Sequence, residues 1–580
     1  MLSLKKISII ALSTIYLSFA THTSFAQGTG AQIQYDTSYD IVTPIHAKHG
    51  VVSSEHVLAS QIGLDILKRG GNAIDAAVAV GFALAVVLPN AGNIGGGGFM
   101  LIHDAKSGKD IALDFRELAP SLARRDMFLD ANGKVIPGGS TSTHLAVGVP
   151  GTVAGLDLAL RKYGTMKLKD VIEPSIKIAE QGFVVSSHLE SLLTASQGQL
   201  GRWPSSRAIF FKGDRPLRAG ELLVQKDLAH SLRLIAQHGP SAFYEGEIAQ
   251  KIVAEMKQHG GLISAEDMKS YKAIEREPVR GTYRGYDVIS MPPPSSGGAH
   301  IIQMLNMLEN FPLAAQGHNS AMTVHQMAEV MKLAYADRSE YLGDPDFTKV
   351  PIKGLTSRAY ANELVKKIDL NKATPSSTIK PGKPIPYESD QTTHYSVADE
   401  KGNLVATTYT LNLLFGSGIV ATGTGITLNN EMDDFSIKPG VPNAFGLLGG
   451  DANAVGANKR PLSSMTPTIV MKDNKPFLIT GSPGGSRIIT TTLQIILNTI
   501  DHKLNAAEAS IAPRMHHQWE PDVIRLERGF SADTLEILGQ KGHKISVGRT
   551  MGKTQTIKFN GTDIEAFSDP RNPDGRALGY

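Results

Sequence analysis

The run QTTHYS (391–396) sets two threonines beside a histidine. A threonine that begins a chain can act as a nucleophile, because its own α-amino group, with a pKa of roughly 7.7–8.0, takes the hydroxyl proton. That chemistry requires the peptide bond before Thr392 to be cut, since an amide nitrogen is not a base. A threonine that opens a β-strand explains the same residues, and residue type alone favours this plainer interpretation.

Other common nucleophiles and metal sites have no signature in this sequence. The 580 residues include no cysteine, which excludes thiolate nucleophiles, disulfides and thiolate-bound metals. No serine stands in G-x-S-x-G and no H-E-x-x-H occurs, so neither a serine-hydrolase elbow nor a zincin is expected. GKT (552–554) lacks the preceding glycine of a phosphate-binding loop. We therefore expect no metal and no cofactor.

The composition is that of a globular protein. Hydrophobic residues make up 41% of the chain and charged residues 19%. Basic and acidic residues nearly balance, at 58 against 55, and the net charge is +3. This balance gives no reason to expect nucleic acid or an anionic membrane as a partner.

Residues 1–26 have the pattern of a secretory signal peptide. Lys5 and Lys6 precede an apolar run over 7–20, and the small residues of SFA (24–26) follow it. The apolar run is shorter than the ~20 residues that span a bilayer, so no stable membrane anchor is expected. We expect cleavage near Ala26 and a periplasmic or secreted mature protein.

Helical patterns dominate the first half of the chain. Two helices are expected between 54 and 88, the first capped by Ser54 and ended by the turn RGGN (69–72). Amphipathic helices are expected over most of 158–275.

The second half mixes strands with helices. Strand-turn-strand patterns occupy 393–411 and 466–485, and a helix with regular apolar spacing follows over 486–502. The Pro- and Lys-rich stretch 371–388 is expected to be an exposed linker. Hairpins flanked by helices indicate sheets that are covered on their outer faces.

Eight longer motifs follow one another along the chain. They are GGNAIDAAVA (70–79), GNIGGGGFM (92–100), DFRE (114–117), MPPPSSGG (291–298), YADRSEYLGDPDF (335–347), QTTHYSV (391–397), KRPLSSMTPTIV (459–470) and GSPGGSRIITT (481–491). Together they resemble the bacterial γ-glutamyltranspeptidases, members of the N-terminal-nucleophile hydrolase superfamily. The resemblance covers nearly all of the chain after the signal peptide.

The resemblance implies an α+β fold, an αββα four-layer sandwich in which two sheets lie between helical layers. It also implies that the chain cuts itself between Gln391 and Thr392. Residues 1–26 would be the signal peptide, 27–391 the large subunit and 392–580 the small subunit of a heterodimer. Both subunits would belong to one interwoven unit rather than to separate domains.

The implied substrate is a γ-glutamyl amide, typically glutathione. Arg116, in DFRE, matches the arginine that grips the α-carboxylate of the glutamyl group, and its planar fork suits bidentate binding. Ser463 and Ser464 match hydroxyl groups that hold the same carboxylate.

Three further residues match groups around the α-ammonium of the glutamyl group. Asp434, in NNEMDDF (429–435), matches the carboxylate that pairs with the ammonium, and Asn412 and Glu431 match groups beside it. Glu431 departs from many bacterial relatives, which carry glutamine there. A second anionic group still suits an ammonium, so we expect an altered affinity rather than a different substrate class.

The resemblance also supplies the expected catalytic groups. Gly484 and Gly485 match the backbone N–H groups of an oxyanion hole, where a helix N-terminus adds its dipole. Thr410 matches a threonine that holds the nucleophile and assists self-cleavage. Thr393 and His394 are expected to support the site without transferring protons.

In the expected mechanism, Thr392 attacks the γ-carbonyl with its own amine as base and forms a γ-glutamyl ester. Water resolves the ester by hydrolysis, or an amino acid or dipeptide acceptor resolves it by transpeptidation. The segment 437–450 resembles the lid over the glutamyl pocket. Its Phe445 replaces a tyrosine of some relatives, so we expect a lid held by packing, and changing Phe445 to tyrosine should alter affinity or turnover.

Two other functions remain open. A cephalosporin acylase of the same superfamily would cut a glutaryl amide, which lacks the ammonium that Asp434 and Asn412 are expected to bind. An uncut periplasmic protein could instead bind γ-glutamyl peptides without cutting them. A comparison of glutaryl and γ-glutamyl anilides tests the first alternative, and a denaturing gel tests the second.

Overall fold

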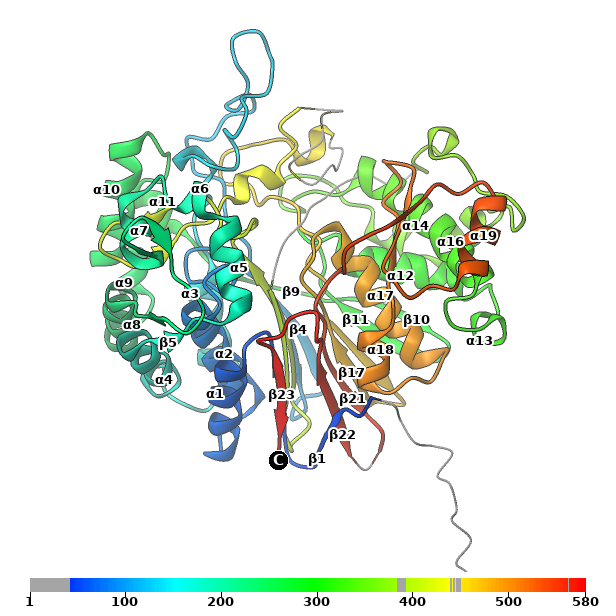
Figure 1. Ribbon diagram of the computed structural model, residues 1–580, viewed down its shortest axis with the longest axis horizontal. Coiled ribbons are helices and arrows are strands. Elements are labelled where there is room, and N and C mark those ends of the chain that lie inside the picture. The colour runs from blue at the N-terminus through cyan, green and yellow to red at the C-terminus, as the bar shows by residue number, and fades with distance from the viewer. Residues whose placement is uncertain (1–41, 383–392, 439–440, 442–443, 445–449, 562) are drawn as a thin grey trace, which may run out of the picture. The chain divides into compact units, whose positions relative to one another are not determined.

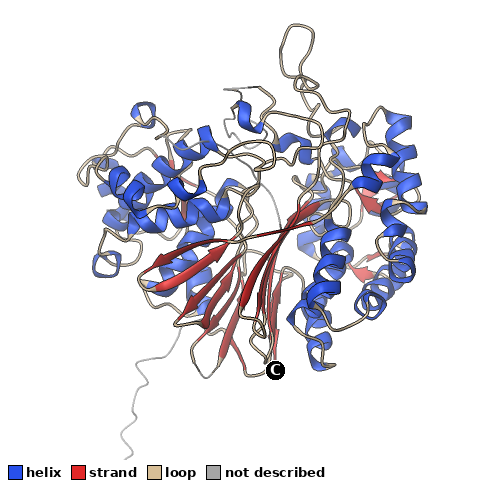
Figure 2. Cartoon of the chain, turned by 180° about the vertical axis from the view of Figure 1, so that it is seen from behind, coloured by secondary structure: helices blue, strands red, loops and turns tan. Residues whose placement is uncertain are grey.

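Two antiparallel sheets form the centre of the computed structural model, which describes residues 42–382, 393–438, 441, 444, 450–561 and 563–580. Helices pack on the outer side of each sheet, so the layers run helix, sheet, sheet, helix (Figures 1 and 2). The expected αββα sandwich is confirmed.

The first sheet, here termed sheet I, contains the strand that follows the expected cut. All of its neighbouring strands are antiparallel, and Val397 pairs with Val405 in the predicted hairpin. In spatial order its strands are β23 (Arg576–Gly579), β2 (Val51–Ser54), β12 (Thr393–Ala398), β13 (Leu404–Thr410), β3 (Gly97–Asp104), β4 (Lys109–Phe115) and β9 (Ile274–Arg276).

The second sheet, termed sheet II, contains the other predicted hairpin. Its turn places Asp473 and Asn474 at φ values of 50° and 58°, as a two-residue turn between twisted antiparallel strands requires. In spatial order the strands are β1 (Ile45–Ala47), β22 (Ile564–Ser568), β21 (Gln555–Phe559), β17 (Lys475–Thr480), β16 (Thr468–Lys472), β11 (Tyr286–Ser290) and β10 (Val279–Tyr283).

Apolar side chains from both sheets form a core between them. Phe99 and Leu101 of β3 belong to the same buried cluster as Ile469 of β16 and Ile479 of β17. Each sheet is therefore covered on both faces, which explains why every residue of β12 and β13 is buried. This double burial makes the sheets a rigid support for the residues at their ends.

Helices from the first half of the chain cover sheet I. Every residue of α2 is buried, and its many alanines let α1 and the sheet approach closely. The expected cap of α1 is wrong by two residues: His56, not Ser54, accepts the hydrogen bond from Leu58 N, because the helix starts only at Val57. The helices are α1 (Val57–Lys68), α2 (Ala73–Val87), α3 (Thr152–Tyr163), α4 (Leu168–Gln181), α5 (Ser187–Ala195), α6 (Gln197–Leu200), α7 (Pro204–Phe210), α8 (Lys226–His238), α9 (Ser241–Tyr244), α10 (Glu247–His259) and α11 (Ala265–Ser270).

A second group of helices covers sheet II. The MPPPSSGG motif joins β11 to α12, and the expected helix after 485 begins at Ser486. Apolar residues of α12, α14 and α17 pack on Val470 and Leu478 of the sheet. The helices are α12 (Gly297–Leu308), α13 (Leu313–Gln316), α14 (Ala321–Tyr341), α15 (Ile352–Leu355), α16 (Arg358–Val365), α17 (Ser486–Ile500), α18 (Ala506–Ile511) and α19 (Ala532–Gln540).

Short elements complete the described part of the chain. Two-residue strands form local pairs, and a small three-stranded sheet lies near the C-terminal helices. These elements are β5 (Phe183–Val184), β6 (Phe211–Lys212), β7 (Arg215–Pro216), β8 (Leu222–Leu223), β14 (Val420–Ala421), β15 (Ile426–Thr427), β18 (Met515–His516), β19 (Ile524–Leu526), β20 (Ile545–Val547), η1 (His144–Ala146), η2 (Ser376–Thr378), η3 (Glu431–Asp434) and η4 (Asp451–Asn453).

The stretch expected to be an exposed linker is only partly exposed over 371–382. Ala373, Ser376 and Ile379 are buried, and the backbone N–H of Ala373 donates to Lys541 O at 2.7 Å. The expectation followed from polar composition, which does not reveal that buried partners hold a segment. Residues 383–388 lie outside the described residues.

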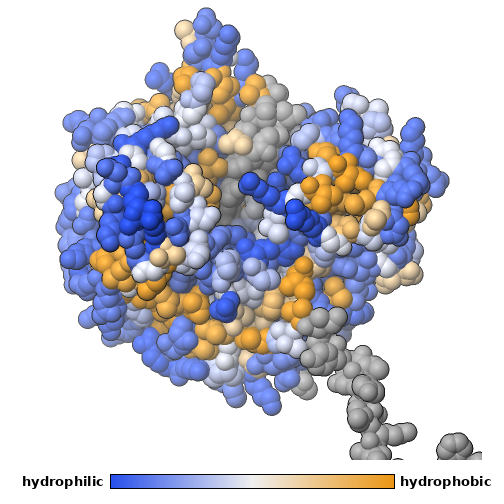
Figure 3. Space-filling view, viewed as in Figure 1, coloured by the Kyte–Doolittle hydropathy of each residue, from blue (hydrophilic) through white to orange (hydrophobic). Residues whose placement is uncertain are grey.

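No helix among the described residues is long and apolar enough to span a bilayer. Hydrophilic side chains cover much of the face shown in Figure 3, and hydrophobic ones form separate areas between them. The expected signal peptide, 1–26, lies outside the described residues.

Candidate active site

One end of sheet I gathers residues that are far apart in sequence. β12 begins there at Thr393, and β13 ends there at Thr410, which pairs with Gly97 at the start of β3. On the other side of β3, β4 ends at Phe115. Arg116 therefore leaves the sheet at the same end as Thr410.

The glycine run GGGG (95–98) makes this convergence possible. A Cβ atom at Gly96 would lie 2.0 Å from the carbonyl oxygen of Thr410, and one at Gly97 would lie 2.5 Å from that of Phe115. Any side chain would therefore push the ends of β13 and β4 away from β3.

The buried side chain of Arg116 joins two acidic residues of η3. Its Nη1 donates a hydrogen bond to Glu431, and its Nη2 donates to Asp434. Nε and Nη2 also donate to the carbonyl oxygens of Pro461 and Leu462, at 3.1 and 3.0 Å. The structure thus brings together three motifs: DFRE, NNEMDDF, and the residues PLSS (461–464) of KRPLSSMTPTIV.

Negative charge exceeds positive charge in this cluster. Glu117 lies 3.6 Å from Arg116 Nη1, so three carboxyl groups share one guanidinium. Burial is the largest of the causes that raise the pKa of Glu117, Glu431 and Asp434. Burial alone would lower the pKa of Arg116, but the three carboxylates together raise it and keep the guanidinium charged. A further cation that entered the cluster would be stabilised.

Ser463 and Ser464 lie in the loop that contacts Arg116. Arg338 of α14 donates through Nη2 to Ser464 Oγ and through Nε to Ser296 Oγ, the latter at 3.0 Å. The N–H of Ser296 donates to the carbonyl oxygen of Ser463 at 2.7 Å. Sequence reasoning identified both serines and the YADRSEY motif but missed the role of Arg338 in holding the loop.

Thr410 and Asn412 form a turn at the end of β13. Asn412 has a φ of 75°, in the left-handed region that asparagine tolerates, and its N–H donates to Thr410 Oγ1 at 2.8 Å. Its Nδ2 donates to Asn430 O at 3.0 Å, beside η3. Its Oδ1 is buried and accepts no hydrogen bond from the described residues. The turn therefore places an available acceptor next to the acidic cluster.

The two predicted oxyanion-hole glycines form the turn between β17 and α17. Their φ values are 129° for Gly484 and 69° for Gly485, both in the region that favours glycine. Gly485 is the N-cap of α17, so the positive end of the helix dipole lies at this turn. A Cβ at Gly484 would lie 3.3 Å from the Cα of Gly552, which shows that two loop backbones pack directly together.

A pocket of about 130 Å³ lies between the turn at the end of β13 and the glycine turn before α17. Thr410, Asn412 and Gly484 line it together with Glu55 and Lys553. The structure thus brings together two catalytic candidates, Thr410 and Gly484, that are far apart in sequence. Sequence reasoning missed both residues: Glu55 lies in no motif, and GKT (552–554), which contains Lys553, was considered only as a phosphate-binding loop.

Glu55 holds the first described residues of β12. Thr393 Oγ1 and the His394 N–H donate to its Oε1, at 2.7 and 3.3 Å, and Asn572 Nδ2 donates to its Oε2 at 3.0 Å. Burial is the main cause of its raised pKa. Burial lowers the pKa of His394 to about 3, so its imidazole is neutral at neutral pH. The supporting role of Thr393 and His394 stays a prediction.

Three predicted residues lie outside the described residues: Gln391, Thr392 and Phe445. The nucleophile and the lid side chain therefore stay predictions from the sequence. Near the lid, Ala444 N donates to Asp433 Oδ2 at 3.3 Å, and Ser140 Oγ donates to Oδ1 at 2.6 Å.

Two groups of histidine and glutamate elsewhere in the described residues place three ligand-type atoms within 4.8 Å of one another. In the first, His325 Nδ1 and His543 Nε2 share a hydrogen bond of 2.7 Å, and Lys332 Nζ donates to Glu329 at 2.8 Å. The second comprises His144, Glu255 and His259, and His144 Nε2 lies 3.1 Å from Glu255 Oε1.

The chain is similar to known proteins in both sequence and structure. The family model described as Gamma-glutamyltranspeptidase matches residues 59–579. A glutathione hydrolase proenzyme of Escherichia coli (strain K12) is 57% identical over 580 residues, which cover 100% of this chain and 99% of the relative.

Two solved structures are also similar. A cephalosporin acylase from Bacillus halodurans has a TM-score of 0.84 at 30% identity and covers 94% of this chain and 98% of its own. A γ-glutamyltranspeptidase from Helicobacter pylori has a TM-score of 0.56 at 50% identity and covers 59% of this chain and 97% of its own. With the family model matching nearly the whole chain, this protein belongs to the γ-glutamyltranspeptidase family.

Proposed function

We propose that this protein is a γ-glutamyltranspeptidase that also hydrolyses glutathione. The single observation that carries the proposal is the buried group of one guanidinium and three carboxyls beside the pocket lined by Thr410 and Gly484. An amino-acid end offers a carboxylate to the guanidinium and an ammonium to the carboxyls of that group. The relatives named glutathione hydrolase proenzyme support the same substrate class.

Substrate binding is proposed to exchange partners within the charged cluster. The α-carboxylate takes the guanidinium fork of Arg116, with Ser463 and Ser464 as further donors. The α-ammonium takes Asp434, Glu431 and the buried Oδ1 of Asn412. Arg116 exchanges protein carboxylates for the substrate carboxylate, and the acidic residues exchange the guanidinium for the ammonium. Neither exchange therefore leaves these groups without a partner of opposite charge. The residues proposed to bind the glutamyl end of the substrate are Arg116, Asn412, Glu431, Asp434, Ser463 and Ser464.

Catalysis is proposed to begin with maturation. The chain cuts itself between Gln391 and Thr392, giving a large subunit, 27–391, and a small subunit, 392–580, which stay together as a heterodimer. The new α-amino group of Thr392 then takes the proton of its own hydroxyl group. Thr410 holds the nucleophile and assists the cut.

The acyl transfer follows from that arrangement. Thr392 Oγ1 attacks the γ-carbonyl, and the N–H groups of Gly484 and Gly485 stabilise the oxyanion. The amide bond breaks, the amine product leaves with the proton, and a γ-glutamyl ester of Thr392 remains. Water gives glutamate, whereas an amino acid or dipeptide acceptor gives a new γ-glutamyl amide, so ping-pong kinetics are expected.

The proposed location is the periplasm or the exterior of the cell, after removal of the signal peptide near Ala26. The N-terminal pattern of Lys5, Lys6 and the following apolar run supports this location. No stable membrane anchor and no nucleic-acid partner are proposed.

Donor analogues and a denaturing gel test this function. Purified protein should release p-nitroaniline from γ-glutamyl-p-nitroanilide far faster than from glutaryl-p-nitroanilide, which lacks the ammonium. The similarity to a cephalosporin acylase keeps an acylase as the rival function. The glutaryl compound represents the substrate expected for that rival. A faster reaction with the glutaryl compound would favour the acylase.

Maturation has its own test. The wild-type protein should give two bands on a denaturing gel, whereas Thr392→Ala should give one band and no activity. A single band from active wild-type protein would rule out the proposed maturation, and a single band without activity would favour a binding protein.

A further inference from the structure

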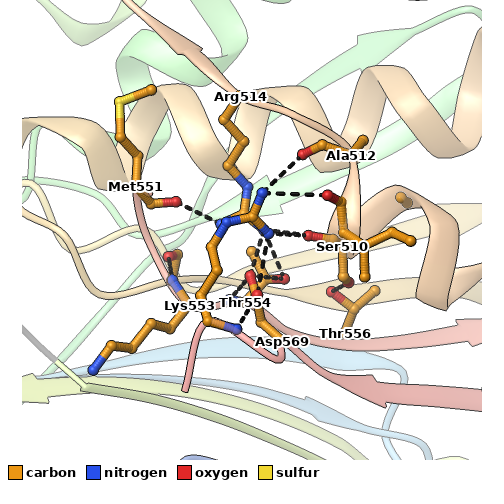
Figure 4. A network of polar contacts seen from close by, with 12 residues as sticks. Ser510, Ala512, Arg514, Met551, Lys553, Thr554, Thr556 and Asp569 are labelled. Atoms are coloured by element: carbon orange, nitrogen blue, oxygen red, sulfur yellow. Dashed lines mark hydrogen bonds and ion pairs between the residues drawn. The ribbon is translucent and has the colours of Figure 1, made fainter. Parts of the chain in front are cut away.

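Lys553 reaches the active-site pocket from a loop that is fixed on several sides. Its backbone N–H donates to Ser482 Oγ at 2.9 Å. Before it, Met551 O accepts from Arg514 Nη1 at 2.6 Å, and after it, Thr554 N donates to Asp569 Oδ2 at 3.0 Å. In Figure 4 the Lys553 side chain extends away from the Arg514 network. The fold therefore presents this ammonium at a defined place.

The surroundings of Lys553 Nζ leave it able to bind an anion. Its side chain is 27% exposed, and its Nζ lies 3.5 Å from His188 Nε2 and 3.8 Å from Glu55 Oε2. Glu55 also accepts hydrogen bonds from Thr393 and Asn572. An ammonium has three N–H donors, and within the described residues only His188 lies at hydrogen-bond distance from it.

The loop also places Lys553 near Gly484, where the reacting carbonyl is proposed to bind. Gly552, the residue before it, packs directly against Gly484. The described residues that line the pocket include Gly484 and Lys553 but not Arg116 or Asp434. If the glutamyl end lies at Arg116 and its γ-carbonyl at Gly484, the pocket beside Lys553 is left for the other half of the amide.

We propose that Lys553 is a specificity-determining residue that binds the carboxylate of the peptide half of the substrate. The inference rests on the proposed function, and it assigns peptides with a free carboxylate as the preferred leaving groups and acceptors. One subsite serves both, because the acceptor attacks the ester along the path by which the leaving amine departed. Lys553 contributes an N–H···carboxylate contact and takes part in no bond change.

Matched substrates test the proposal on the wild-type enzyme. As donors, glutathione is compared with its C-terminal glycinamide form; as acceptors, glycylglycine is compared with glycylglycinamide. Each pair differs only in the carboxylate. A hydrogen bond to a charged group contributes enough for a preference of about tenfold to hundredfold in kcat/KM for each carboxylate compound. Equal kcat/KM within either pair would overturn the proposed role for that half-reaction.

A variant then assigns the preference to this lysine. Lys553→Gln should bring the ratio of kcat/KM between glutathione and its amide close to one, and Lys553→Arg should keep most of the preference. Lys475→Gln, at an exposed lysine of the β16–β17 hairpin, serves as the matched control and should leave the ratio unchanged. A Lys553→Gln enzyme with the full wild-type ratio would overturn the assignment.

The two proposals fail in different ways. No turnover of γ-glutamyl-p-nitroanilide by wild-type protein would contradict the proposed function. Normal turnover of that anilide, without a carboxylate preference in the matched pairs, would contradict only the role of Lys553. Activity is expressed per cleaved chain, measured on a denaturing gel, so that incomplete maturation of a variant does not affect the ratios.

Discussion

At the scale of residues, the charged side chains around Arg116 have the clearest chemical consequence. One buried guanidinium faces Glu117, Glu431 and Asp434, and burial raises the pKa of each carboxyl. An ammonium that binds there gains a desolvated carboxylate partner. This contact contributes more to the binding free energy than the same contact at the surface. This residue group should therefore separate glutamyl from glutaryl donors.

Asp434→Asn should remove most of that discrimination. Losing a buried charged partner of the ammonium should lower kcat/KM for γ-glutamyl-p-nitroanilide about a hundredfold, while glutaryl-p-nitroanilide changes much less. Steady-state kinetics with both anilides measure the ratio. The matched control is Asp433→Asn, at an adjacent carboxylate that bonds Ser140 and Ala444 instead. Equal losses for the two anilides would argue against an ammonium site at Asp434.

Glu55 leads to a second prediction, which concerns maturation. Its carboxylate holds Thr393 Oγ1 and the His394 N–H, directly after the bond expected to break. Because small misplacements of reacting groups cost about a hundredfold in rate, Glu55→Ala should slow self-cleavage at least about tenfold. A time course of precursor and fragments on a denaturing gel measures the rate.

The comparison for Glu55 is Glu255→Gln, which changes a buried carboxylate beside His144. That variant should mature at the wild-type rate. If Glu55→Ala matured as fast as the wild-type protein, the hydrogen bonds from Glu55 to Thr393 and His394 would not be needed for the cut.

At the scale of elements, buried ion pairs hold the loop before β21. Arg514 bonds Ser510 O, Met551 O and Asp569, as Figure 4 shows, and Arg571 reaches Asp569 Oδ1 at 3.1 Å. These contacts come from the segments around α18, β18 and β22. One guanidinium therefore holds several loops together. Neither arginine lies in a motif that the sequence made conspicuous.

Arg514→Leu should therefore destabilise the protein by about 3 kcal/mol, because it leaves a buried carboxylate and two carbonyls with fewer partners. Urea unfolding of the uncut Thr392→Ala chain measures the free energy without a concentration-dependent step. Arg528→Leu, at an exposed arginine, should change it by less than about 0.5 kcal/mol. A loss no larger than this control would mean that the network is not needed for stability.

Another set of contacts fastens the segment that precedes the expected cut. His325 Nε2 donates to Asp369 O, Lys332 Nζ donates to Thr374 O, and Asp337 Oδ1 accepts from Gly382 N. All three side chains belong to α14. The large subunit would thus keep its last described residues bound to its own helix after the cut.

At the scale of the whole molecule, strands from both sides of the expected cut share each sheet. In sheet I, β2 lies between β23 and β12, and in sheet II a block of later strands separates β1 from β11. Each described strand lies wholly before or wholly after residue 391, so a cut there interrupts none of them. This topology supports the expectation that the two subunits form one interwoven unit.

Buried histidines set a pH limit for the same unit. Burial lowers the pKa of His300, His394 and His516 to about 3 each. In the unfolded chain a histidine has a pKa near 6.5. Below that pH the unfolded state therefore binds protons that the folded state does not bind. The free energy of unfolding should fall with decreasing pH, by about 1 kcal/mol per pH unit for each such histidine. The buried carboxyls with raised pKa act in the opposite direction.

A single substitution isolates this effect. His516 bonds Thr490 Oγ1 at 2.9 Å, and His516→Gln removes its titration. Between pH 6 and pH 4 the variant should lose stability less steeply than the parent, by about 1 kcal/mol per pH unit. Urea unfolding of Thr392→Ala chains at several pH values gives the slopes. His238→Gln, at an exposed histidine, should leave the slope unchanged, and an unchanged slope in both variants would contradict the prediction.

Much of the fold followed from the sequence because its signals are local. Apolar spacing and turn residues predicted the β12–β13 and β16–β17 hairpins, the helix α2 and the start of α17. The Ser54 cap was wrong, and the expected linker is only partly exposed over 371–382. Which residue begins a helix, and which polar stretch is held by buried partners, depend on contacts distant in sequence. The motifs identified the family, and with it Arg116, Asp434 and the paired glycines.

The sequence by itself determined the residue types at the site, because chemistry and close backbone approach limit them to few choices. Only the tertiary structure decided which of them meet. Gly96 and Gly97 bring the ends of β13 and β4 to β3, so that Thr410 and Arg116 leave one end of a sheet. It also placed Glu55 and Lys553 in the same pocket, which no motif indicated, because antiparallel pairing and loop packing join segments hundreds of residues apart.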